Sequence, residues 1–145
     1  MRMGMNPSRA LPFLLPLLAL LSAAPATTPP TMADKTTALR EEWKDRLHEE
    51  GLNALAAPPF VIAGNGTPAQ LARYRDSTVL AAMHSLEATY FDKSPTEPIV
   101  IFLFESEGPY KRLALKWFDD KNVPHYGFYR HRERVMFMNV GTGTG

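Results

Sequence analysis

Apolar residues follow two patterns along the chain. Some recur every three or four residues, as in helices, and others form short continuous runs, as in buried strands, so the sequence predicts helices interleaved with strands. In segment 34–50 the apolar side chains recur every fourth residue and share one helical face: Leu39, Trp43 and Leu47. Asp34 is placed to cap the start of this helix, and Gly51 to end it. Pro58 and Pro59 then impose an extended segment.

A strand–turn–helix unit is predicted next. Residues 60–63 are apolar and β-rich, and Gly64-Asn65-Gly66 closes them as a tight turn. Thr67-Pro68-Ala69-Gln70 follows the capping-box pattern, with Thr as N-cap, Pro at the first helical position and Gln at the third. A long helix is therefore expected to run to about Phe91. Its apolar stripe is Val79, Met83, Leu86 and Tyr90.

The second half of the chain predicts a covered strand, a helix and a hairpin. Residues 99–104 are continuously apolar, as in a strand covered on both faces near the middle of a sheet. A helix is expected over 110–119, and two strands, 127–130 and 135–140, flank a polar turn. The predicted fold class is α+β: an N-terminal helix, then β-α-β-α and a β-hairpin, forming a small mixed sheet covered by helices.

The first 26 residues have the layout of a secretory signal. Arg2 and Arg9 precede an apolar run over 11–21, and small residues follow, with Ala24 and Ala26 fitting an A-x-A cleavage site. We expect cleavage after Ala26 and an exported, periplasmic or extracellular protein with no membrane span after cleavage. The alternatives are an uncleaved membrane anchor and a buried helix, but the run is too short for a bilayer, which needs about 20 residues. Residues 27–33 are predicted to be a flexible lead-in to one domain over 34–145.

Composition narrows the function classes. The 145 residues include 16 Lys and Arg, 15 Asp and Glu, and no Cys. Loss of Arg2 and Arg9 with the signal leaves 14 basic and 15 acidic residues, a net charge of −1. That balance argues against a nucleic-acid partner, although the predicted hairpin carries a group of aromatic and arginine residues that could stack on bases: Tyr126, Phe128, Tyr129, Arg130, Arg132 and Arg134. The lack of Cys excludes disulfides and thiolate chemistry.

No complete catalytic or metal motif is present. His48-Glu49-Glu50 starts like H-E-x-x-H, but Leu52 stands where the second His would be. His84, His125 and His131 have no zinc-ligand spacing. Ser106 lacks the glycines of a nucleophile elbow and is read as a helix cap. Glu105 and Glu107 are read as loop charges rather than a paired acid and base. Gly64-Asn65-Gly66-Thr67 lacks the lysine of a P-loop, which favours a plain turn over a phosphate site.

The order of elements from Phe60 onward resembles the N-terminal part of gluzincin, or peptidase-MA-like, bacterial metallopeptidases. The resemblance covers about residues 60–145 and includes the Gly-aromatic strand Tyr126-Gly127-Phe128-Tyr129 and the apolar strand 135–140. In that family a helix carrying H-E-x-x-H starts soon after the last strand. The corresponding residues here are 141–145, Gly-Thr-Gly-Thr-Gly. The resemblance therefore implies a domain incomplete at its C-terminal end, inactive by itself. Zinc is implied for the complete family member, with no metal ligand, catalytic residue or cofactor in this chain.

The resemblance also implies a substrate-binding strand. In the family the strand before the zinc helix pairs with an extended peptide, which maps to Phe137, Met138 and Asn139. The alternative is that this strand only packs into the core. Two functions are expected on these grounds. The first is the non-catalytic N-terminal part of an exported zinc metallopeptidase acting on peptides or proteins. The second is an exported non-enzymatic α+β module that binds peptides or envelope partners.

Overall fold

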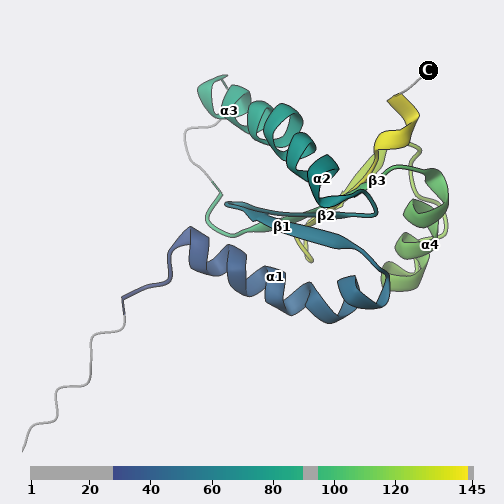
Figure 1. Cartoon of the computed structure of the whole chain (residues 1–145), viewed down its shortest axis with the longest axis horizontal. Helices are drawn as coiled ribbons and strands as arrows, with labels where there is room; N and C mark the ends of the chain where they lie inside the picture. The colour runs from purple at the N-terminus through teal and green to yellow at the C-terminus, as the bar shows by residue number, and fades with distance from the viewer. Residues whose placement is uncertain (1–27, 90–94, 144–145) are drawn as a thin grey trace, which may run out of the picture.

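The molecule is a mixed five-stranded sheet with helices on both faces (Figure 1). The computed structural model describes residues 28–89 and 95–143. The strands are β1 Asn53–Ala57, β2 Phe60–Gly64, β3 Ile99–Phe104, β4 Gly127–Arg130 and β5 Val135–Asn139. The helical segments are α1 Met32–Glu49, α2 Pro68–Tyr74, η1 Arg75–Val79, α3 Leu80–Thr89, α4 Glu107–Phe118 and η2 Val140–Gly143. The predicted fold class, α+β with a small mixed sheet, is confirmed.

Three parallel strands form the centre of the sheet, and an antiparallel strand flanks them on each side. The strand order is β1-β2-β3-β5-β4, with β2, β3 and β5 parallel. β1 pairs antiparallel with β2, and β4 pairs antiparallel with β5. β3 is the middle strand, as its continuous apolar sequence predicts, and four of its residues are at most 5% exposed: Val100, Phe102, Leu103 and Phe104.

The two faces of the sheet carry separate apolar clusters. On one face α1 and α4 pack on β2, β3 and β5 through an aromatic core that includes Trp43, Phe102, Tyr110 and Phe137. On the other face Leu71 of α2 packs on Ile62, Ile101 and Leu103. Figure 1 shows α1 below the sheet and α2 and α3 above it. The β2–β3 and β3–β5 connections therefore pass over opposite faces.

The N-terminal helix starts earlier than its sequence predicts. Thr31, not Asp34, is the N-cap: its hydroxyl accepts from the Asp34 amide at 3.2 Å, and the Asp34 carboxylate accepts from the Thr31 amide at 2.9 Å. The predicted cap Asp34 is thus the third helical residue of a capping box. The lead-in predicted over 27–33 is too long, because Met32 and Ala33 belong to α1. Gly51, at φ +64°, follows the helix end as predicted.

The long helix predicted from Thr67 is interrupted by a wider turn. Thr67, Pro68 and Gln70 take the predicted capping positions, but residues 75–79 form a π-helical turn between α2 and α3. Tyr74 and Val79 are five positions apart in the sequence. The wider π-helical turn between them lets both side chains face the same side of the sheet. Tyr90 and Phe91, the predicted last stripe residue and helix end, lie outside the described residues.

Other boundaries also differ from the prediction. Strand β1 is an addition to the predicted order, joined to β2 through a cis peptide bond between Pro58 and Pro59. Helix α4 begins at Glu107 rather than 110, with Pro109 in its first turn, where a missing amide costs nothing.

The predicted signal segment 1–26 lies outside the described residues. Among residues 28–89 and 95–143, no helix is long and apolar enough to cross a membrane.

Two glutamates connect segments that are distant in the sequence. Glu97 accepts from Lys35 of α1 at 2.7 Å and from Arg134 of the hairpin turn at 3.1 Å. Glu50, whose side chain is 7% exposed, accepts from Arg112 and Lys116 of α4 at 2.6 Å each. Hydrogen bonds from Lys35 and Arg134 lower the pKa of Glu97, and those from Lys116 and Arg112 lower the pKa of Glu50.

We expect folding stability to fall in acid because of these carboxylates. A folded-state pKa below the unfolded value adds stability that is complete above the unfolded pKa, here the ordinary 4.5, and is lost as the pH drops through the lowered value. Urea midpoints measured from pH 7 to pH 3 should therefore decline below about pH 4.5. The double variant Glu50→Gln, Glu97→Gln should decline less over the same range, and an equal decline would contradict the assignment.

Candidate functional site

A polar pocket lies where the chain leaves the carboxyl ends of β2 and β3. Its volume is about 280 Å³ and its lining is Gln70, Arg73, Tyr74, Ser77 and Glu105. β2 continues into α2 over one face of the sheet, whereas β3 continues into α4 on the other. Such a divergence between adjacent parallel strands opens a crevice, the usual ligand position in open α/β sheets.

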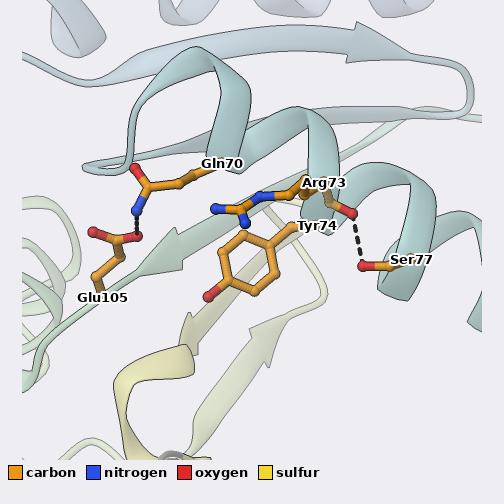
Figure 2. Close-up of a pocket in the computed structure, with 5 residues that line it drawn as sticks. All are labelled: Gln70, Arg73, Tyr74, Ser77 and Glu105. Atoms are coloured by element: carbon orange, nitrogen blue, oxygen red, sulfur yellow. Dashed lines mark hydrogen bonds between the residues drawn. The ribbon is translucent and has the colours of Figure 1, made fainter.

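Hydrogen bonds hold the rim of the polar pocket in place. The side-chain oxygen of Asn65, just after β2, accepts from the Glu105 amide, just after β3, at 2.9 Å. The Gln70 side-chain amide donates to the Glu105 carboxylate at 2.6 Å, while its oxygen accepts from the Thr67 amide at 2.7 Å. Figure 2 shows the Gln70–Glu105 contact. Gln70, the third residue of the α2 capping box, thereby fixes the orientation of the Glu105 carboxylate.

The other wall of the polar pocket comes from the π-helical turn and the residues before it. Figure 2 shows the Arg73 guanidinium extending above the Tyr74 ring toward Gln70. Within the described part of the chain, Arg73 makes no salt bridge through its side chain, and its carbonyl accepts from the Ser77 hydroxyl at 2.7 Å. The pocket thus combines an unpaired cation with a carboxylate held by an amide.

An apolar groove of about 670 Å³ adjoins the polar pocket, and Tyr74 lines both. Its floor is the sheet face made by Ile99, Ile101, Leu103, Met136 and Met138, and its helical wall includes Val79, Met83 and Leu86. No residue of α3 is buried, so this helix covers the sheet face without packing closely on it. Its volume and its mostly apolar lining are within the range of protein binding pockets.

The family resemblance predicts that the strand containing Phe137, Met138 and Asn139 pairs with an extended substrate, but this strand has no free edge. β5 lies between β3 and β4, so its backbone is paired on both sides. Phe137 is fully buried in the core and Met138 lines the apolar groove. Asn139 is 4% exposed and donates to the His125 carbonyl at 3.2 Å. Among the described strands, the outer edge on this side of the sheet belongs to β4.

The other candidate residues from the sequence analysis lie in different parts of the structure. Glu105 lines the polar pocket, while Glu107 pairs with Lys111 at 2.6 Å and lies 3.8 Å from His125. Ser106 occupies the N-cap position of α4, without a side-chain cap hydrogen bond. The residues predicted as a plain turn, 64–67, connect β2 to α2 as expected. The sequence marks Gln70 only as the third residue of a capping box, and nothing in it marks Arg73, Tyr74 or Ser77.

The family resemblance implies zinc for the complete family member, with no metal ligand among these residues. Within residues 28–89 and 95–143, no three His, Asp or Glu side chains gather as a metal site requires. His48, His84, His125 and His131 are exposed and lie in different segments. Comparisons with protein-family models, with curated proteins and with solved structures found no match.

Proposed function

We propose that these residues form the non-catalytic N-terminal part of an exported, gluzincin-like zinc metallopeptidase, a hydrolase of peptide bonds whose catalytic residues lie outside the 145-residue sequence. The apolar groove carries the proposal. A sheet face buries its apolar side chains against another element, yet here Ile99, Met136 and Met138 are only partly buried and line a hollow beneath α3. An amphipathic helix from a following segment would fill that hollow and complete the second layer.

The position of β4 supports a peptide or protein substrate. Among residues 28–89 and 95–143, β4 pairs only with β5, so its other edge presents backbone groups that an extended peptide can join as an added strand. The side chains of Tyr126 and Tyr129, which are 69% and 44% exposed, flank that edge. We therefore assign peptide contact to β4 in place of Phe137, Met138 and Asn139.

The decisive experiment is to read the genomic DNA beyond the codon for Gly145. We expect the reading frame to continue and to encode H-E-x-x-H soon afterwards, followed by a third zinc ligand. The extended protein, purified from the periplasm or medium, should contain zinc and cleave peptides, and should begin after Ala26. An in-frame stop directly after Gly145, or an extended protein without hydrolytic activity, would refute the peptidase assignment.

Dye binding tests the role assigned to the groove. The 145-residue chain should bind 8-anilinonaphthalene-1-sulfonate, because the apolar groove is left uncovered. The extended protein should bind much less dye. Equal fluorescence from the two proteins, or a cooperatively melting short chain that binds no dye, would contradict the need for a covering segment.

The second candidate is an exported, non-enzymatic α+β module that binds peptides or envelope partners. Tyr129 favours it, since this residue belongs to the free edge strand and also lines the apolar groove. A bound strand on β4 would thus lie beside an apolar surface that can receive its side chains. Peptide libraries distinguish the candidates: the peptidase releases fragments, whereas the module retains intact peptides.

A further inference from the structure

The polar pocket is a candidate binding site in addition to the apolar groove and the edge of β4. Its lining comes from α2, from the π-helical turn and from the residue that follows β3. The diverging β2–α2 and β3–α4 connections create it, so its position follows from the topology of the sheet rather than from a loop insertion. Its volume of about 280 Å³ suits a ligand at the small end of the range that protein pockets accept.

Charges of both signs face this small volume. The Arg73 guanidinium has no salt-bridge partner in the described part of the chain and presents planar donors suited to a carboxylate. Glu105 keeps one carboxylate oxygen beyond the one that Gln70 occupies at 2.6 Å. A ligand with a negative group for Arg73 and a positive group for Glu105 would satisfy both without leaving either charge unpaired.

Tyr74 adds an apolar surface between these charges and the groove. Its half-buried ring contributes to the apolar cluster on this face of the sheet and also lines the polar pocket. An apolar substituent on a ligand held at Arg73 and Glu105 would contact that ring.

We propose that this pocket binds a free α-amino acid with an apolar side chain. The Arg73 guanidinium receives the α-carboxylate, the Glu105 carboxylate receives the α-ammonium, and the side chain packs on Tyr74. Gln70 acts as a positioning residue, because it holds Glu105 in place. This proposal does not rest on the peptidase assignment, and a stop codon after Gly145 would leave it intact.

Calorimetric titration with three ligands tests the proposal on the full chain. L-Leucine should bind saturably, whereas leucinamide, which lacks the carboxylate, and N-acetyl-L-leucine, which lacks the ammonium, should each bind at least about tenfold more weakly. The Arg73→Gln variant should lose the preference for leucine over leucinamide. The Glu105→Gln variant should lose the preference for leucine over N-acetyl-leucine.

The controls use the same substitutions on α1. Arg40 and Glu42 are exposed residues of α1, which packs on the face of the sheet opposite to α2. The variants Arg40→Gln and Glu42→Gln should therefore leave all three affinities unchanged. Arg73 and Glu105 are themselves exposed, so the variants should retain the circular dichroism of the original chain. No saturable binding of leucine up to about 10 mM, or an unchanged ligand preference in both pocket variants, would overturn the proposal.

Discussion

Replacing Phe137 with alanine is expected to lower the free energy of unfolding by about 3–5 kcal/mol. Phe137 is fully buried, and its ring centroid lies 4.8 Å from that of Phe102, 5.1 Å from that of Phe104 and 5.3 Å from that of Phe128. Removing it opens a cavity at the point where α4 and the hairpin meet the sheet. A loss of this size is a large fraction of the stability of a small domain.

Urea denaturation measures this loss, with the midpoint falling while the slope stays constant. Tyr126→Ala is the matched control, because that aromatic side chain is 69% exposed, and it should change stability by no more than about 0.5 kcal/mol. Equal effects of the two substitutions would mean that the hairpin does not pack against α4 as described.

The second large effect is expected from Gly64→Ala, a single added methyl group at the end of β2. A Cβ at this position would lie 2.1 Å from the Leu103 carbonyl oxygen and 3.1 Å from the Leu103 carbonyl carbon. Both atoms belong to the backbone of the neighbouring strand, so only movement of the strands relieves the overlap. We expect a destabilisation of about 3 kcal/mol, together with loss of the Asn65–Glu105 contact that closes the polar pocket.

Gly108→Ala provides the control for this second prediction. No atom lies within 4 Å of a Cβ added there, and Gly108 is in the first turn of α4, where alanine is the better helix former. Thermal unfolding should place the Gly108 variant at or above the original chain and the Gly64 variant well below it. The reverse order would exclude a close approach of β2 and β3 at Gly64.

Local sequence signals predicted most of the fold because they are strong where they occur. The capping box at Thr67 and the apolar run of β3 specify their elements without help from the rest of the chain. β1 was missed since Asn53–Ala57 reads NALAA, a sequence with small residues and little β-propensity. Pairing with β2 makes it a strand, and that pairing is a tertiary interaction.

The candidate site was harder to predict because its members come from two crossovers. Gln70 and Glu105 are 35 positions apart, and they meet only because β2 and β3 are adjacent and parallel. The assignment of Phe137, Met138 and Asn139 to a substrate-binding strand comes from the family resemblance. In this sheet β5 inserts between β3 and β4, so β4 and not β5 is the outer strand.

The interior position of β5 has a consequence for how the chain is made. β5 is the last strand of the described residues to be synthesised, yet it separates β3 from β4. Until residue 139 has emerged, β3 lacks one neighbour and β4 has none, so the sheet cannot close on the growing chain. Completion of the sheet therefore waits for the C-terminal hairpin, so the last strand to be synthesised is the one that joins β4 to the rest of the sheet.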